Sequence, residues 1–248
     1  MKAGVLIIGS LFWDKKAHRE KWRNRLNMNE KKRVEVPIGY GRIATSRGNT
    51  YTMTFRDDGK MGKAIFIPFS PEIKTRSDLI EQALAMWDAE QSEKRKTNTI
   101  GSSWGVVGAL FKNEYELSKE WTDYFQTEIE KNYTDLESMR YVDEHGFLRI
   151  PWPKVVEESK PIDADIILAT VTKPTSKTIP NAIQIAKAWI EQSKGYEKYF
   201  FNNIKSNIQT AEDLDIWKAI KQHNPEWLKK SEYSSAIEIL EKELDKEV

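Results

Sequence analysis

Residues 7–13, with the sequence Ile-Ile-Gly-Ser-Leu-Phe-Trp, are the first part of the chain whose residue types could do chemistry. Glycine adopts backbone angles that are closed to other residues, so Gly9 would let consecutive peptide N–H groups converge on one point. A concavity of this kind binds a carboxylate or another oxyanion. A Gly-Ser pair after a strand is also typical of an ordinary tight turn, so both interpretations stay open at this point.

The residue types that are missing restrict the chemistry further. The 248 residues include no cysteine and only three histidines, His18, His145 and His223. This composition excludes a disulfide framework, a thiolate zinc site and a cysteine nucleophile. Three histidines are also too few to favour a multi-histidine metal site, or a catalytic triad in which a histidine would activate Ser10. We therefore expect carboxylates, hydroxyls, arginines and backbone amides to carry any chemistry.

The charges are balanced over the whole chain but not along it. Lysine and arginine number 39 against 38 aspartates and glutamates, a formal net charge of +1, which argues against a globally basic nucleic-acid-binding protein. Nine basic residues nevertheless fall between positions 15 and 33, with Trp13 and Trp22 interleaved. This basic segment could follow a phosphate backbone. We favour a solvated face that draws an anionic ligand to a nearby pocket, and we do not expect nucleic acid as a partner.

The apolar run at residues 3–13 superficially resembles a short signal peptide. It contains Gly9 and Ser10 and lacks a small-residue cleavage site, so we interpret it as a buried strand that enters a tight loop. No stretch approaches the roughly 18 apolar residues that a membrane span requires. We expect a cytoplasmic protein with no membrane partner, and the missing cysteines agree with that location.

Hydrophobic periodicity predicts the elements that would position these residues. Strands are expected near residues 5–8, 34–40, 50–55, 63–68, 105–111 and 165–171. Helices are expected from an N-cap at Ser77 through Trp87, near 117–133, and throughout the chain after residue 173. Because strands and helices do not alternate regularly, the pattern favours a barrel or an α+β sheet over a doubly wound one. We expect residues 1–172 to form the core and residues 173–248 a helical extension packed on it.

The loop after the first strand also carries a family resemblance. Gly9, Ser10, Leu11 and Trp13 match the Tyr-Gly-Ser-Leu-x-Trp signature of the gamma-glutamylcyclotransferase-like superfamily, particularly its ChaC-type branch. Further similar motifs follow in the same order: Gly39-Tyr40-Gly41-Arg42, Arg47-Gly48, Trp104-Gly105-Val106-Val107, Ile185-Ala186, Gly195 with Glu197-Lys198-Tyr199, and Asp213. The resemblance implies a small mixed β-barrel flanked by helices, followed here by a helical C-terminal extension.

Two positions depart from the family pattern. Ile8 stands where the family has tyrosine, which removes a phenol from the expected substrate pocket. The catalytic glutamate of the family, often in an Asp-x-x-Glu-Gly setting, has no clean match. Counting from Trp104 places it within residues 124–133, so Glu128 and Glu130 are the candidates, and Glu120 is a more distant third.

The resemblance implies an activity and a set of roles. The amides of Gly9, Ser10 and Leu11 would hold the α-carboxylate of a gamma-glutamyl group. A glutamate would move a proton from the α-amine to the departing amine while the five-membered lactam of 5-oxoproline closes. This reaction needs no metal and no cofactor. The other substrate-binding candidates are Trp13, Arg42, Arg47 and Trp104.

An alternative function remains open. The same fold could keep its anion-binding loop without catalysis and serve as a module that binds a small ligand or a nucleotide. Ile8 and the missing catalytic motif favour this alternative. The oligomeric state is not predicted.

Overall fold

The computed structural model describes residues 1–91, 98–132, 140–175, 179–192 and 194–245. Within these ranges the strands are β1 (Ala3–Ile7), β2 (Lys32–Val36), β3 (Ile38–Ala44), β4 (Thr50–Phe55), β5 (Gly62–Pro68), β6 (Gly101–Ser102), β7 (Gly105–Phe111), β8 (Lys154–Val155) and β9 (Ile166–Thr172). The α-helices are α1 (Ala17–Arg23), α2 (Arg76–Glu90), α3 (Glu116–Asn132), α4 (Ala182–Gln192), α5 (Lys198–Lys205), α6 (Asp213–His223) and α7 (Ser234–Leu244). No helix in these ranges is both long and apolar enough to cross a membrane.

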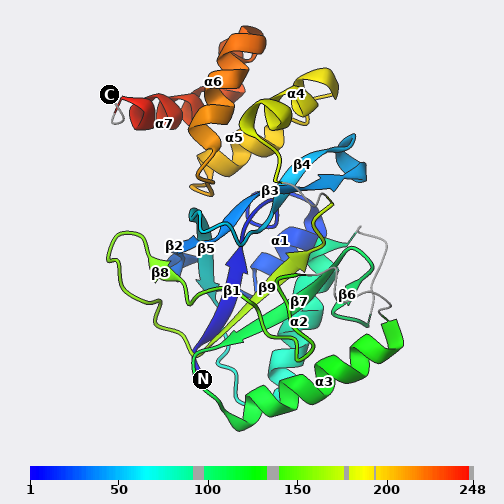
Figure 1. Cartoon of the computed structure of the whole chain (residues 1–248). Coiled ribbons are helices and arrows are strands. Elements are labelled where there is room, and N and C mark those ends of the chain that lie inside the picture. The colour runs from blue at the N-terminus through cyan, green and yellow to red at the C-terminus, as the bar shows by residue number, and fades with distance from the viewer. Residues whose placement is uncertain (92–97, 133–139, 176–178, 193, 246–248) are drawn as a thin grey trace.

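The described strands form a mixed, curled sheet with β1 at its centre. The order is β6-β7-β9-β1-β5-β2-β8, and β3 and β4 form a separate hairpin. Strand β1 pairs in parallel with β9 and antiparallel with β5, so Val5 lies opposite both Leu168 and Ile67. Figure 1 shows the sheet curled like half of a barrel, with helices around it. The expected α+β class is therefore confirmed.

Strand β1 is buried along its whole length. A central strand covered on both faces needs a continuous apolar run instead of an alternating pattern, and Ala3–Ile7 supplies one. Its carboxyl end delivers the chain to Gly9. The interpretation of residues 3–13 as a buried strand followed by a tight loop is confirmed.

Residues 34–40 belong to two strands instead of the single expected strand. Pro37 separates β2 from β3, because proline has no backbone N–H to donate to a continuing ladder. As a result β2 pairs with β5, while β3 leaves the main sheet and pairs with β4. The register of this hairpin shifts between Tyr40 and Arg42, after which Arg42 lies opposite Thr52.

The N-cap of helix α2 lies two residues before the predicted cap. Thr75 is the N-cap: the Asp78 amide donates to Thr75 Oγ1 over 3.2 Å, and the Thr75 amide donates to Asp78 Oδ2 over 2.8 Å. These two bonds form a capping box, which satisfies two backbone donors at once. Ser77 lies inside the helix and is exposed, so its prediction as the cap was wrong.

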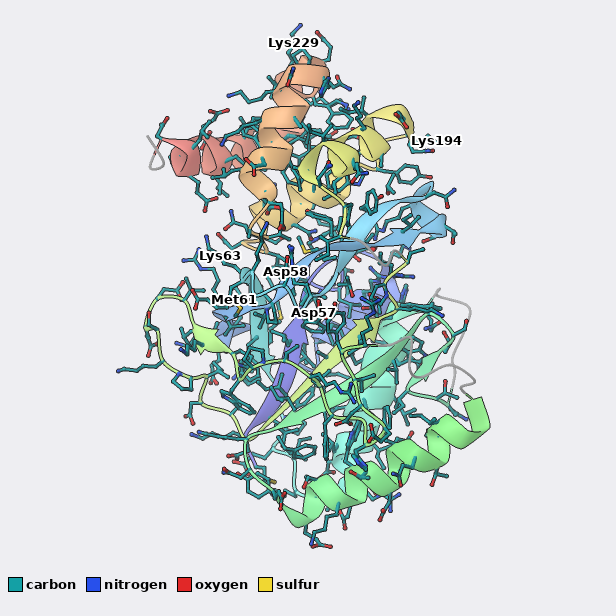
Figure 2. All side chains as sticks on the ribbon, viewed as in Figure 1. Asp57, Asp58, Met61, Lys63, Lys194 and Lys229 are labelled. Carbon is teal, nitrogen blue, oxygen red and sulfur yellow. The ribbon has the colours of Figure 1, made fainter. Side chains whose placement is uncertain are left out.

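The helices after residue 173 pack on the β3–β4 hairpin, with α4 against β4, at the end of the molecule opposite α3 (Figure 1). Two tryptophans expected in the core, Trp189 and Trp217, are fully buried, and Tyr40 of β3 contacts Trp189 edge to face at 5.2 Å. Figure 2 shows Asp58 and Lys63 where the strands meet these helices. Lys63 Nζ donates to Gln209 Oε1 over 2.9 Å at this border. The helical region thus meets the strands through packed and hydrogen-bonded contacts.

The capping box gives a direct test of the helix start. Thr75→Ala should lower the free energy of unfolding by about 1 kcal/mol, because the Asp78 amide loses its acceptor. Ser77→Ala, two residues later on the exposed surface, should change it by less than about 0.5 kcal/mol. Urea denaturation followed by circular dichroism measures both. Equal effects of the two substitutions would contradict this assignment of the cap.

Candidate functional site

The turn after β1 opens onto a cavity of about 410 Å³. Its walls come from the turn itself, α1, the β3–β4 hairpin, the end of α2, the connection between β6 and β7, β9 and α5. The lining residues used below are Gly9, Ser10, Leu11, Arg19, Arg42, Arg47, Glu90, Gln91, Trp104, Thr170, Thr172 and Tyr199. A volume of this size suits a small-molecule ligand.

The turn that lines this cavity contains backbone donors without a partner among the described residues. The Phe12 amide donates to Gly9 O over 3.1 Å, and the Asp14 amide donates to Ser10 O over 2.9 Å. The amides of Ser10 and Leu11 make no hydrogen bond within the described ranges, as is usual for the first N–H groups of a helical turn. Two neighbouring free amides at one wall of a cavity are suited to binding an anion.

Gly9 is required by the close approach of Tyr199 from α5. A Cβ atom added at Gly9 would lie 2.6 Å from the Tyr199 hydroxyl oxygen, closer than any real Cβ contact. The same hydroxyl accepts a hydrogen bond from the Met53 amide over 3.2 Å. Burial raises the pKa of Tyr199, so its phenol stays protonated. The C-terminal helices therefore complete the cavity by placing a phenol beside the turn.

Two arginines donate hydrogen bonds to the Ser10 hydroxyl of the turn. Ser10 Oγ accepts hydrogen bonds from Arg19 Nη1 at 3.0 Å and from Arg47 Nη2 at 3.2 Å. Arg19 also pairs with Asp14 at 3.0 Å. The Arg47 guanidinium lies over the Tyr199 ring, 4.8 Å from its centroid, and this contact favours a fixed orientation of the cation.

Arg42 is held by aromatic rings from another part of the chain. Its guanidinium lies 4.5 Å from the centroid of Trp104, and Trp104 stacks on the fully buried Trp87 of α2 at 4.7 Å. Burial lowers the pKa of Arg42, although arginine remains charged at neutral pH. The positive charge of Arg42 is therefore fixed on the cavity wall in a partly dehydrated place.

Glu90 supplies the carboxylate of the cavity. It is the last residue of α2, its side chain is 20% exposed, and its Oε2 atom lies 3.8 Å from Arg19 Nη2. Burial raises the pKa of Glu90, and the positive charges of Arg19, Arg42 and Arg47 oppose this shift. Its place at the carboxyl end of a helix also disfavours a negative charge. Glu90 thus has a raised pKa while facing three cations, which is a typical environment for an acid–base group.

Sequence reasoning missed Glu90, although a signal was present. Glu90 lies seven residues after Ala83 and three after Trp87, so it belongs to the face of α2 that carries these buried residues. A glutamate on the apolar face of a helix needs a polar partner or a cavity. The setting Asp88-Ala89-Glu90 is also one residue shorter than the Asp-x-x-Glu motif of the resembled family, so a search for that motif passed over it.

The structure brings most of the predicted substrate-binding residues together. Gly9, Ser10, Leu11, Arg42, Arg47 and Trp104 all line the cavity. Trp13 does not line it, because its indole Nε1 donates to Asn203 Oδ1 over 2.6 Å on the other side of the turn. There its ring meets Tyr199 edge to face at 6.0 Å.

Glu128, predicted as a catalytic candidate, lies elsewhere. It belongs to α3, follows the buried Trp121 and Phe125 on the same helix face, and is itself buried. Figure 1 shows α3 near the N-terminus, whereas the turn follows the opposite end of β1. Glu128 does not line the cavity. The side chain of Glu130 lies outside the described residues.

Two buried polar atoms of the cavity lining have no hydrogen-bond partner among the residues described: Thr172 Oγ1 and Gln91 Nε2. Buried polar groups are rarely left unsatisfied, so these two atoms favour a polar ligand. In the same ranges, no group of three or more histidine, cysteine or acidic side chains is placed to hold a metal ion.

Comparison with known proteins adds no assignment. The chain matches no family model, and no curated protein or solved structure matches it. The cavity itself is therefore the main evidence on function.

The electrostatic balance at Glu90 can be measured directly. Carbon-detected NMR titration of the glutamate carboxyls should give Glu90 a pKa above the ordinary value of 4.5. Arg42→Gln should raise this pKa further, because a cation that favours the ionised form is removed. Arg25→Gln, which removes a cation paired with Glu81 on the surface, is the matched control and should leave it unchanged. A Glu90 pKa at or below 4.5, or one insensitive to Arg42, would contradict the described environment.

Proposed function

We propose that this cavity is the active site of a cofactor-independent cyclotransferase, which converts a gamma-glutamyl amide or peptide into 5-oxoproline and a free amine. One observation carries the proposal: Glu90 lines the same cavity as Ser10 and Leu11, whose amides have no partner among the described residues. The Glu90 carboxyl can move a proton, and the two amides can hold a carboxylate. The finer fold assignment, a gamma-glutamylcyclotransferase-like barrel, belongs to this proposal, and the curled sheet with its Gly9-Ser10-Leu11 turn supports it.

Substrate binding follows from the charges on the walls. The α-carboxylate of the gamma-glutamyl group accepts hydrogen bonds from the Ser10 and Leu11 amides. Arg47, which already donates to Ser10 Oγ, adds a positive charge beside this carboxylate. Binding the carboxylate at one wall orients the α-amine and the γ-carbonyl of the same residue toward each other, and such orientation supplies a large part of the rate of an intramolecular reaction.

The chemistry then needs one acid–base group. The neutral α-amine attacks its own γ-carbonyl carbon, and ionised Glu90 accepts the proton that the attacking nitrogen loses. The new C–N bond closes the lactam, and the old amide C–N bond breaks. Glu90 returns the proton to the departing nitrogen, so the carboxylate is regenerated. A raised pKa suits both steps, because it brings the group closer to the working pH. Below that pKa Glu90 is protonated, so the rate should fall as the pH falls.

Tyr199 supplies a phenol near the position where Ile8 replaces the tyrosine of the family pattern. Ile8 lines the cavity where a phenol was expected, and the Tyr199 hydroxyl reaches the wall beside Gly9 from α5. We infer that Tyr199 provides the phenol that Ile8 lacks. This role also explains why the helical region is needed for a complete site.

The proposal is tested with gamma-glutamyl compounds. The purified chain should release 5-oxoproline, detected by mass spectrometry, from at least one member of a panel of gamma-glutamyl dipeptides, gamma-glutamyl amines and glutathione. Glu90→Gln should lower the rate by about 10² to 10⁴, the usual value of general acid–base catalysis, because glutamine cannot exchange the proton.

Glu128→Gln is the matched control for this experiment. The same isosteric change on α3 should leave the rate within about twofold once the fraction of folded protein is taken into account. Loss of activity in Glu128→Gln with full activity in Glu90→Gln would reverse the assignment. No product from any member of the panel would contradict the enzyme, and the noncatalytic ligand-binding function would then be favoured.

A further inference from the structure

A second cleft lies on the other side of the turn that follows β1. It has a volume of about 800 Å³ and shares no lining residue with the first cavity. Phe12 and Trp13 come from the turn, other walls from the chain around β2 and from β5, and the rest from the carboxyl end of α5. One turn thus divides its residues between two binding spaces: residues 9–11 face the first, and residues 12 and 13 face the second.

The second cleft is strongly basic. Four cationic side chains line it, against the single acid Glu157: Lys15, Lys31, Arg33 and Lys205. Glu157 pairs with Arg33 at 2.8 Å, so the charges of the three lysines are not neutralised by it. All three are exposed, and none makes an ion pair or side-chain hydrogen bond within the described ranges. Three uncompensated positive charges around one concave space attract a ligand with several negative charges.

Neutral polar groups and aromatic rings complete the walls. Asn202, Ser206 and Asn207 lie at the end of α5 and offer amide and hydroxyl donors. Phe12 and Trp13 are both partly exposed. The hydrogen bond from Trp13 Nε1 to Asn203 fixes the indole in place, so little conformational entropy is lost when a planar group packs against it.

We propose that this second cleft binds a nucleoside di- or triphosphate, with its phosphates on Lys15, Lys31 and Lys205 and its base against Phe12 and Trp13. The three lysines match the several charges of a polyphosphate, and the two rings match a planar base. The basic segment at residues 15–33 contributes Lys15, Lys31 and Arg33 to this cleft. None of these three residues lines the first cavity, so the proposal gives them a role of their own. This proposal is independent of the cyclotransferase activity.

Isothermal titration calorimetry of the full chain tests the proposal with four probes: ATP, inorganic tripolyphosphate, adenosine and an oligouridylate. ATP should bind about fivefold or more tightly than tripolyphosphate, since base stacking on an aromatic ring adds to the phosphate contacts. Adenosine alone should bind much more weakly than ATP. ATP affinity should fall steeply between about 50 and 200 mM salt, because counterions compete for the lysines.

Variants assign the binding to the cleft. Lys31→Glu combined with Lys205→Glu should lower the affinity for ATP about tenfold or more, because two charge-assisted contacts become repulsive. Lys21→Glu combined with Lys194→Glu changes the net charge equally at exposed positions outside both cavities, and Figure 2 shows Lys194 near the end of α4. This matched control should bind ATP like the parent chain. Phe12→Leu should reduce ATP affinity toward that of tripolyphosphate.

Several results would overturn the proposal. ATP binding that survives the Lys31 and Lys205 changes but is lost in Arg42→Gln with Arg47→Gln would place the nucleotide in the first cavity. Oligouridylate binding that is far tighter than ATP binding would identify a nucleic-acid surface instead. Equal affinities for ATP and tripolyphosphate would show that the nucleoside contributes nothing to binding, and would contradict the proposed contact of the base with Phe12 and Trp13. The Lys31 and Lys205 variant should keep the parent rate of 5-oxoproline release, so failure of one proposal is distinguishable from failure of the other.

Discussion

Two arginines of the first helical segment fix the turn on which both binding spaces depend. Arg23 Nη1 donates to Leu11 O over 2.7 Å, and Arg23 Nη2 donates to Asp14 O over 2.8 Å. Arg19 Nη1 reaches Ser10 Oγ and Asp14 Oδ2. These charge-assisted bonds use the carbonyls and side chains of the turn and leave its Ser10 and Leu11 amides free. The turn is therefore rigid without consuming the donors that a ligand needs.

The chemistry of the first cavity comes from two opposed effects on one carboxyl. Burial and the end of α2 disfavour a negative charge on Glu90, while Arg19, Arg42 and Arg47 favour it. Without the cations the pKa of Glu90 would be higher still, and with full hydration it would be lower. The aromatic rings that hold Arg42 and Arg47 keep this balance in place, because they fix where the positive charge lies.

The sequence predicted those features that depend on local pattern. The apolar run before Gly9, the turn itself and the buried tryptophans follow from periodicity and from the properties of glycine, and the resemblance gathered Arg42, Arg47 and Trp104 at one site. Features set by tertiary packing were missed. Glu90 becomes significant only when α2 places it beside three arginines, and Tyr199 only when α5 packs against Gly9. Trp13 lines the second cleft and not the first, and spacing alone does not say which way a turn residue faces.

The central claim is that the turn binds a carboxylate next to Glu90. The most direct measurement is a titration of the ¹⁵N-labelled protein with 5-oxoproline, the proposed product, followed by amide chemical shifts. The account predicts large, saturable shifts at the Ser10 and Leu11 amides and smaller ones at residues around Glu90, with α3 unaffected. Saturable shifts that lie elsewhere and spare Ser10 and Leu11, or no shifts at millimolar ligand, would contradict it.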